Sequence, residues 1–363
     1  MSVTGRPPTA TTARGLVAVL VTVLAGTTGC AAAGAGPRDV LGAMQGRQQV
    51  EEAAASVAAA KASRSAATAS GKVASECSPS QEASFPPLSS LPAPGKAPAG
   101  TLAAKITARG YLVVGVSGDT RLLGARNARK SGQLEGFDIE LAKALARAIF
   151  GTSDNRVRFK VITAGERFAL VNKGADAGGV DIVARAVSMT CERWKSSNPV
   201  EGALFSAGYF TSDQRLLVRN DLGVKSIQDL KPGLDRVCAP IGSTSLAELA
   251  EHKFVKPVAA EIHSDCLALW QEGRVAAITG DDAILAGFAD QDPRAVVVGT
   301  PMDTTYYAFA IGRGQEDFVQ YVNAVMETPA FQSSWAAAYA TYLKAGLGER
   351  SFPAPNYSRP LSR

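Results

Sequence analysis

The sequence has little histidine, little charge imbalance and no long hydrophobic run. Its only two histidines, His252 and His263, lack the spacing of a metal site or a catalytic triad, which argues against a histidine-based active centre. Lys and Arg outnumber Asp and Glu by only 38 to 33, and no run of like charges forms a basic arm, so we expect no nucleic-acid partner. A Cys-x-x-Cys pair is absent, and we expect neither a cofactor nor a bound metal.

What the sequence does contain is enough apolar material for a packed core. Apolar residues make up 46% and charged residues 20% of the 363 positions, a balance typical of globular chains. At about 100–200 residues per domain, this length allows roughly two domains together with extensions.

The first 30 residues predict an export signal. Arg6 and Arg14 precede an apolar stretch, residues 16–25, that is too short for a membrane span of about 20 residues but typical of a signal peptide. The segment that follows, Thr27-Thr28-Gly29-Cys30, resembles a bacterial lipobox, whose cysteine is lipidated and becomes the first mature residue. We therefore expect residues 1–30 to be a lipoprotein signal peptide, and a palmitate-type lipid on Cys30 to anchor the protein at the extracytoplasmic face of the cell membrane. An ordinary secretory signal with an incidental Cys30 is the alternative.

The cysteine count supports export. If Cys30 carries a lipid, four of the five cysteines remain, and in an oxidising compartment they can pair in three ways. We expect the disulfides Cys238–Cys266, because both residues lie in one predicted lobe, and Cys77–Cys191. Free buried thiols are the alternative.

Residues 31–100 differ in composition from the rest of the chain and predict a tether. Ala, Gly and Ser dominate up to Ser75, and the prolines that follow disfavour regular structure: Pro79, Pro86, Pro87, Pro92, Pro94 and Pro98. We expect this segment to connect the membrane anchor to the folded body. Its final part would pack on that body if Cys77 forms a disulfide.

From Thr101 onward, the hydrophobic pattern alternates between strand and helix. Leu141, Leu145 and Ile149 recur every four residues and predict one apolar face of a helix. Short apolar runs predict strands over 111–116, 157–162, 181–184, 216–218, 237–239, 276–278 and 296–298. This alternation predicts two α/β blocks, each with a mostly parallel sheet and helices on both faces. Such sheets bind ligands beyond the carboxyl ends of their strands, and clefts between lobes are favoured sites.

Several segments resemble one protein family. Residues 136–149, GFDIELAKALARAI, resemble the signature of the bacterial extracellular solute-binding proteins, family 3, which capture polar amino acids for ABC importers. Further segments resemble the family in the same order along the chain: 181–193, which ends in Thr-x-x-Arg, 205–210, 242–245 and 280–282. The resemblance extends from about Thr101 to Ala345. Within the family, the sequence is similar to actinobacterial glutamate- or glutamine-type binding lipoproteins.

The resemblance implies a two-lobed, type II periplasmic-binding-protein-like fold of the α/β class. Two crossover hinge segments would join the lobes, and we place them near Thr211–Gln214 and Pro301–Thr305. We expect a monomer. Its parts would be lobe 1 over 101–212, lobe 2 over 213–300, a return to lobe 1 over 301–346 and a C-terminal tail over 347–363.

The ligand that the resemblance implies is a zwitterion, whose two charges need partners once they leave water. A guanidinium pairs with a carboxylate through two parallel hydrogen bonds. The Thr-x-x-Arg match implies this role for Arg193, with Ser188 and Thr190 as further donors. The ammonium group needs a carboxylate, for which Asp281 is favoured and Asp282 is the second candidate.

The loop 242–245 is expected to contribute to the same site. The resemblance implies ligand contacts for Ser243 and Thr244, because free N–H groups at a helix start suit an anion. Ser245 and Glu248 form a capping-box pattern, which predicts that Ser245 caps the helix that follows.

Two further residues are candidates for the ligand site. Asp119 belongs to the loop after the first strand, and Arg185 belongs either to the ligand site or to a salt bridge elsewhere. The loop after the first strand is also basic, which is either a solvated turn or a source of positive potential that favours glutamate or aspartate, with glutamine as the alternative ligand. Its basic residues are Arg121, Arg126, Arg129 and Lys130.

Together these features predict a membrane-anchored binding protein that captures a polar amino acid by lobe closure and delivers it to the permease subunits of an ABC importer. A sensor that reports the amino acid to a transmembrane signalling partner is the alternative. A dehydratase-type enzyme on the same fold is less favoured, because the available acids, Asp138 and Glu166, both have sufficient roles at helix starts. We therefore expect no catalytic residue.

Overall fold

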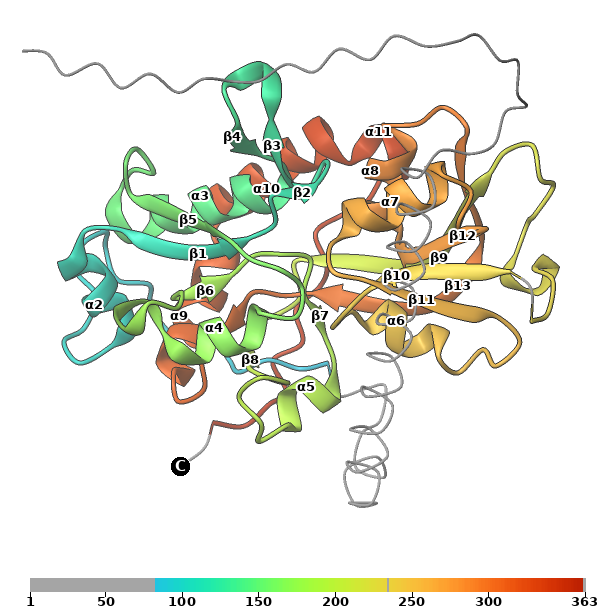
Figure 1. Cartoon of the computed structure of the whole chain (residues 1–363). Coiled ribbons are helices and arrows are strands. Elements are labelled where there is room, and N and C mark those ends of the chain that lie inside the picture. The colour runs from blue at the N-terminus through green and yellow to red at the C-terminus, as the bar shows by residue number, and fades with distance from the viewer. Residues whose placement is uncertain (1–81, 234, 362–363) are drawn as a thin grey trace, which may run out of the picture. The chain divides into compact units, whose positions relative to one another are not determined.

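The computed structural model describes residues 82–233 and 235–361 of the chain. These residues form two α/β lobes, which Figure 1 shows at the left, mainly in cyan and green, and at the right, in yellow and orange. The predicted signal peptide, Cys30, Cys77 and the first part of the tether lie outside the described residues. Within the described ranges, no helix combines the length and the apolar character that crossing a bilayer requires.

Lobe 1 is built on a five-stranded sheet with the strand order β5-β1-β6-β14-β8. The strands are β1 (Leu112–Val116), β5 (Val157–Val161), β6 (Ile182–Val183), β8 (Leu204–Phe205) and β14 (Ala310–Ile311). The helices are α2 (Leu102–Arg109), α3 (Phe137–Phe150), α4 (Arg167–Lys173), α5 (Cys191–Lys195), α9 (Glu316–Met326), α10 (Pro329–Tyr342) and α11 (Lys344–Leu347). A small separate sheet consists of β2 (Asp119–Thr120), β3 (Gly124–Asn127) and β4 (Gln133–Glu135).

Lobe 2 is built on a six-stranded sheet with the strand order β11-β10-β12-β9-β13-β7. The strands are β7 (Ser188–Met189), β9 (Phe210–Arg219), β10 (Arg236–Pro240), β11 (Lys256–Ala260), β12 (Ala277–Asp281) and β13 (Ala295–Tyr307). The helices are α6 (Thr244–Leu249), α7 (His263–Gln271) and α8 (Asp282–Ala289). The predicted disulfide Cys238–Cys266 is present and joins β10 to α7, with the two Cα atoms 5.5 Å apart. The pairing of Cys191 with Cys77 stays a prediction.

Both large sheets are mixed, which differs from the mostly parallel arrangement that the sequence predicts. β1 pairs in parallel with β5 and β6, and β10 pairs in parallel with β11 and β12. β14 runs antiparallel to β6 and β8, and β9 runs antiparallel to β12 and β13. The antiparallel strands belong to segments through which the chain enters or leaves a lobe. A buried apolar run looks alike in either direction, so the pattern does not report strand direction.

β9 and β13 connect the lobes and pair with each other. Their register places Gln214 opposite Asp303 and Ser212 opposite Thr305, so the two predicted hinge segments lie side by side. The pairing is interrupted between Val298 and Asp303, where the register shifts. A rotation of one lobe against the other therefore bends this two-stranded ribbon.

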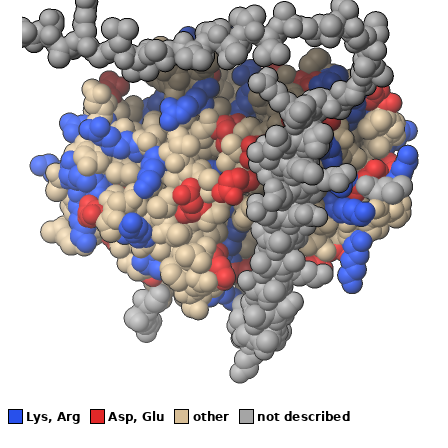
Figure 2. Space-filling view, viewed as in Figure 1, with Lys and Arg blue, Asp and Glu red and all other residues tan. Residues whose placement is uncertain are grey.

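The cores of the two lobes differ in composition. On the lobe 1 side the fully buried large side chains are mainly aromatic: Phe137, Phe205, Tyr209, Phe309, Phe318 and Phe331. In lobe 2 the fully buried aromatic residues are Trp270 and Phe288, together with Phe210 and Tyr307 at the ends of β9 and β13 that adjoin lobe 1, and a separate aliphatic cluster includes Leu216, Val237 and Leu249. On the face shown in Figure 2, basic and acidic side chains are interspersed over both lobes.

Both ends of the described chain pack on lobe 1. We call residues 82–88 the strap and residues 350–361 the tail. Ser84 of the strap is fully buried, and its N–H donates to the Asn356 carbonyl of the tail at 2.8 Å. Asn323 of α9 donates from Nδ2 to the Ser84 hydroxyl at 2.9 Å. The last part of the predicted tether therefore packs on the body, an arrangement that the sequence left open.

Candidate ligand-binding site

Most of the side chains predicted to bind a ligand meet where the two lobes face each other. α4, Ala186 and α5 approach from lobe 1 together with β7, the edge strand of the six-stranded sheet, while the loop before α6, the start of α7 and the end of β12 approach from lobe 2. They enclose a cavity of about 20 Å³, close to the room that one water molecule needs, and we call it the ligand cavity. Its predicted lining residues are Ser188, Arg193, Ser243, Thr244 and Asp281. The sequence analysis missed Arg167 and His263, which also line it.

Arg193 is buried and lines the ligand cavity. The Thr190 hydroxyl caps α5 by accepting the Arg193 N–H at 3.4 Å, which gives Thr190 a capping role and leaves it outside the cavity lining. The Arg193 guanidinium donates to the carbonyls of Ser188 (2.6 Å) and Gly242 (3.2 Å) and lies 5.2 Å from the Phe168 ring centroid. Burial lowers the pKa of Arg193 to about 10, so the group keeps its charge at neutral pH. A carboxylate would be a stronger acceptor for it than these neutral carbonyls.

Arg167, at the start of α4, is the second buried guanidinium of the ligand cavity. It donates from Nε to the Ala164 carbonyl at 2.7 Å and from Nη2 to the Gly242 carbonyl at 2.8 Å. One carbonyl of lobe 2 thus accepts hydrogen bonds from Arg167 and Arg193 of lobe 1. Gly242 has a φ of +75°, and a Cβ there would lie 3.0 Å from the Gly165 Cα, so glycine permits this approach. In the sequence, Arg167 directly follows Glu166 at an expected helix start and is indistinguishable from a solvated residue of a first helical turn.

The two candidate carboxylates face different surroundings. Asp281 lines the ligand cavity and accepts the Tyr307 O–H at 2.7 Å. Burial raises the pKa of Asp281 to about 6, although the Tyr307 hydrogen bond and the charge of Arg193 act in the opposite direction. Asp282 does not line the cavity and instead forms an ion pair with Arg350 at 2.5 Å. The geometry therefore favours Asp281 over Asp282 as the partner of an ammonium group.

The loop 242–245 is arranged differently from the prediction in one respect. Ser243, and not Ser245, caps α6, because the Ser243 Oγ accepts the Leu246 N–H at 3.0 Å. The helix consequently begins at Thr244, two residues earlier than the capping-box pattern predicts. The Thr244 and Ser188 hydroxyls lie 3.3 Å apart, in contact across the two sides of the ligand cavity.

Asp119 and Arg185 lie beside the ligand cavity and do not line it. Asp119 accepts the Ser264 N–H at 3.0 Å and the Ser264 hydroxyl at 2.9 Å, which links β2 of lobe 1 to α7 of lobe 2. Arg185 donates from Nε to the Ile162 carbonyl at 2.8 Å, and its buried Nη2 has no hydrogen-bond partner among the described residues. Burial and the charge of Arg185 lower the pKa of His263 to about 3, so this histidine is neutral. The two predicted residues thus surround the site as structural and electrostatic neighbours.

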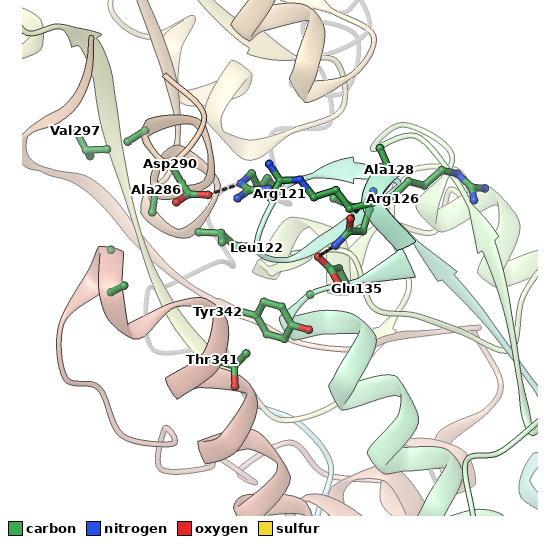
Figure 3. Close-up of a pocket in the computed structure, with 17 residues that line it drawn as sticks. Arg121, Leu122, Arg126, Ala128, Glu135, Ala286, Asp290, Val297, Thr341 and Tyr342 are labelled. Atoms are coloured by element: carbon green, nitrogen blue, oxygen red, sulfur yellow. Dashed lines mark hydrogen bonds and ion pairs between the residues drawn. The ribbon is translucent and has the colours of Figure 1, made fainter. Parts of the chain in front are cut away.

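A larger cavity of about 840 Å³ lies between the β2–β4 sheet, α8 and the end of α10. Figure 3 shows Arg121 of lobe 1 pointing at Asp290, the residue directly after α8, and these side chains form an ion pair between the lobes. The other lining carboxylate, Glu135, pairs with Lys130 at 2.9 Å. These carboxylates are solvent-accessible and already hold cationic partners, so this cavity suits a buried zwitterion less well than the ligand cavity.

The acids that an enzyme would need have structural partners. Asp138 accepts the Ala186 N–H and the Tyr209 O–H, both at 2.9 Å. Glu166 accepts the Thr163 N–H at 2.7 Å. Neither residue lines the ligand cavity.

Comparisons with known proteins bear on the family of the chain. The sequence profile of the bacterial extracellular solute-binding proteins, family 3, matches residues 112–345. The chain is 31% identical over 239 residues to the ABC transporter glutamine-binding protein GlnH of Bacillus subtilis, an alignment that covers 66% of this chain and 83% of that protein. It is 27% identical over 253 residues to the glutamate-binding protein GluB of Corynebacterium efficiens, which covers 67% and 80% of the two chains.

Solved structures show the same fold. The chain is similar to an ancestral amino acid-binding protein described as a precursor of cyclohexadienyl dehydratase, with a TM-score of 0.58 and 27% identity over 67% of this chain and 100% of that chain. This likeness confirms the predicted two-lobed, type II periplasmic-binding-protein-like fold.

Proposed function

The chain belongs to the bacterial extracellular solute-binding proteins, family 3, and we propose that it captures a polar amino acid between its lobes and delivers it to an ABC importer. One observation carries the proposal, namely the opposition of charges across the ligand cavity. Arg167 and Arg193 are buried on the lobe 1 side and Asp281 on the lobe 2 side. This arrangement complements a zwitterion, which needs a cationic partner at one end and an anionic partner at the other.

In the proposed complex, the ligand carboxylate pairs with Arg193 and Arg167 and the ammonium group donates to Asp281. The ligand carboxylate would replace the Gly242 carbonyl as acceptor, and charge-assisted hydrogen bonds are about twice as strong as neutral ones. A cavity of about 20 Å³ is too small for an amino acid, so entry requires the lobes to part at β9 and β13 and to reclose. The hydroxyls of Ser188 and Thr244 would then complete the enclosure.

We propose glutamate or aspartate as the preferred ligand and glutamine as the alternative. Two arginines, Arg167 and Arg193, line the ligand cavity against one carboxylate, Asp281, and the charge of Arg185 beside the cavity faces the carboxylates of Asp119, Asp138 and Glu166. The excess positive charge supports a ligand whose side chain carries a second carboxylate. Relatives named for glutamine and for glutamate are both similar to this chain, so likeness alone does not choose between them.

We further propose that the protein acts at the extracytoplasmic face of the membrane through a lipid on Cys30. The support is the signal-like N-terminus and the Cys238–Cys266 disulfide, since disulfides persist in oxidising compartments. Metabolic labelling with a palmitate analogue tests the anchor. Label on the wild type and none on Cys30→Ser is the expected result, and equal label on both would contradict the proposal.

A thermal-shift screen against the twenty amino acids, followed by calorimetry, tests the binding function. We expect glutamate or aspartate to give the largest shift, with micromolar affinity, or about −8 kcal/mol. A shift with glutamine alone would overturn the argument from charge. The absence of a shift with any amino acid, or turnover of prephenate or arogenate by the purified protein, would overturn the proposed function itself.

A further inference from the structure

The carboxylates of two consecutive residues face two different cavities. Asp281 lines the ligand cavity, whereas Asp282 lines a second cavity of about 200 Å³ beside the hinge strands. Arg350 of the tail and Arg215 of β9 line this second cavity as well. The tail therefore contacts Asp282 from outside the ligand cavity, and Asp282 directly follows Asp281, the proposed partner of the ammonium group.

Arg350 is held at this position by several contacts. Its Nη2 lies 2.5 Å from Asp282 Oδ2, its Nη1 donates to the Thr211 carbonyl at 2.7 Å, and its guanidinium carbon lies 5.3 Å from the Phe210 ring centroid. The Arg350 side chain is 24% exposed and the Asp282 side chain 3%. Asp213 lies farther away, at 3.9 Å. Because the pair is largely removed from solvent and shares a short charge-assisted hydrogen bond, it is screened less than a surface ion pair.

Hydrogen bonds connect this pair to the ligand site. The Ser212 hydroxyl lies 3.2 Å from Asp282 Oδ1 and 3.3 Å from the Tyr307 hydroxyl. The Tyr307 O–H donates to Asp281 at 2.7 Å. The single hydrogen of the Ser212 hydroxyl can go to Asp282 or to Tyr307, because the Tyr307 hydrogen goes to Asp281. A change in the charge of Asp282 therefore reaches Asp281 through space, and it reaches Tyr307 when Ser212 turns from one acceptor to the other.

We propose that Arg350 is a positioning residue for the ligand site, which it serves by offsetting the negative charge of Asp282 so that the adjacent Asp281 stays ionised for the ligand's ammonium group. This inference rests on the proposed function, in that it assigns Asp281 to the ammonium group. The other titratable and charged groups that face Asp281 are Arg167 of α4, Arg193 of α5, His263 of α7 and Tyr307 of β13.

The electrostatics of Asp281 support the proposal. Burial raises the pKa of Asp281 to about 6, and the charge of Asp282 contributes to the rise. Without Arg350, Asp282 would act on Asp281 as an unpaired negative charge in a buried setting and would raise the pKa further. Asp281 would then bind a proton, and lose its attraction for an ammonium group, at a higher pH.

Three variants test the proposal: Arg350→Gln, the double variant Asp282→Asn/Arg350→Gln, and Arg215→Gln as a matched control. Arg215 lines the same cavity but pairs with Asp213, at 3.7 Å, whereas Asp282 pairs with Arg350. The first measurement is the affinity for L-glutamate and L-glutamine from pH 5 to pH 8.5. We expect the midpoint of the pH dependence to rise by about one unit in Arg350→Gln, which weakens binding by about fivefold at pH 6 and by about tenfold at pH 5. At pH 8.5 the affinity should match the wild type.

The double variant distinguishes charge from packing. Removing both charges should return the midpoint to the wild-type value, whereas a loss of tail packing would persist. An unchanged midpoint in Arg350→Gln, an equal rise in Arg215→Gln, or no recovery in the double variant would overturn the proposal.

A second measurement does not require a ligand. The ¹³C carboxyl resonance of Asp281, assigned with Asp281→Asn, can be titrated in the ligand-free protein, and Arg350→Gln should move its midpoint upward by about one unit. If no amino acid binds, the proposed function fails, yet this titration still decides the role of Arg350. An unmoved Asp281 midpoint overturns that role even if binding is normal.

Discussion

The two lobes of this protein reach a stable fold and a binding surface by different means. Lobe 1 fills its interior with aromatic rings and is covered by the strap and the tail, whereas lobe 2 has an aliphatic cluster and the Cys238–Cys266 disulfide. Their facing surfaces also differ, since lobe 1 presents the buried cations Arg167 and Arg193 and lobe 2 presents Asp281. Neither surface alone can neutralise a zwitterion, so the binding energy depends on closing two chemically unlike halves.

The largest expected effect comes from removing the principal cation of lobe 1. Arg193→Ala should weaken amino acid binding by about 2–5 kcal/mol, because it leaves a buried ligand carboxylate without its charge partner. Calorimetry at pH 7.5 measures this loss. Arg158→Ala is the matched control, because Arg158 also lies over an aromatic ring, 5.0 Å from the Tyr111 centroid, but outside the ligand cavity. Near-unchanged affinity in Arg193→Ala would contradict the assignment.

The disulfide tests the difference in how the lobes are stabilised. The bond closes a loop with a sequence separation of 28, so Cys238→Ser/Cys266→Ser should lower the free energy of unfolding by about 3.5 kcal/mol. Hydrogen exchange should accelerate in β10 and α7 and stay slow in β1 and α3, since lobe 1 does not contain this bond. Urea unfolding and exchange mass spectrometry measure the two effects. Equal acceleration in both lobes would show that they do not differ in this way.

The carboxylate of lobe 2 should make binding depend on pH. Burial raises the pKa of Asp281 to about 6, and the ammonium group of a ligand would lower it. Affinity is therefore about half its maximum at pH 6, approaches the maximum about one unit higher and falls by up to about tenfold per unit below pH 6. Asp281→Asn should weaken binding at pH 7.5 by about 30-fold and remove this dependence. Titration calorimetry from pH 5 to pH 8 checks both outcomes. A pH dependence that survives in Asp281→Asn would assign it to another group.

The smallest predicted effect concerns the contact between the lobes. Gly242→Ala should weaken ligand binding by about fivefold, because an alanine at φ +75° is strained and its Cβ would crowd Gly165 at 3.0 Å. Gly273→Ala is the control, since Gly273 has a φ of +72° with nothing within 4 Å of its Cβ position. An equal loss of ligand affinity in both variants would show that backbone strain, and not hindered closure of the lobes, causes the effect.

The order of elements could be predicted from the sequence because it depends on local patterns. The spacing of Leu141, Leu145 and Ile149 gave the apolar face of α3, and the apolar runs gave β1, β5 and β10 within one or two residues. The lining residues Arg193 and Asp281 followed from the family resemblance, which carries information that periodicity lacks. The Cys238–Cys266 pair followed from its place within one lobe.

The rest depends on contacts between distant parts of the chain. Arg167 resembles a solvated residue of a first helical turn until lobe 2 brings the Gly242 carbonyl to it. Ser84 lies in a proline-rich segment with no periodicity, and its burial depends on Asn323, 239 positions away. Ser243 and Ser245 are both suitable helix caps, and only the loop conformation decides between them.

The antiparallel pairing of β9 with β13 makes lobe 2 an insertion within lobe 1. Thr211 and Tyr306 are register partners, so the points at which the chain departs and comes back are neighbours. The stretch between them can therefore be exchanged as a cassette for that of a related protein without displacing either junction. Such an exchange would replace the side of the ligand cavity that carries Asp281. The side that carries Arg167 and Arg193, the strap and the tail would remain those of this protein.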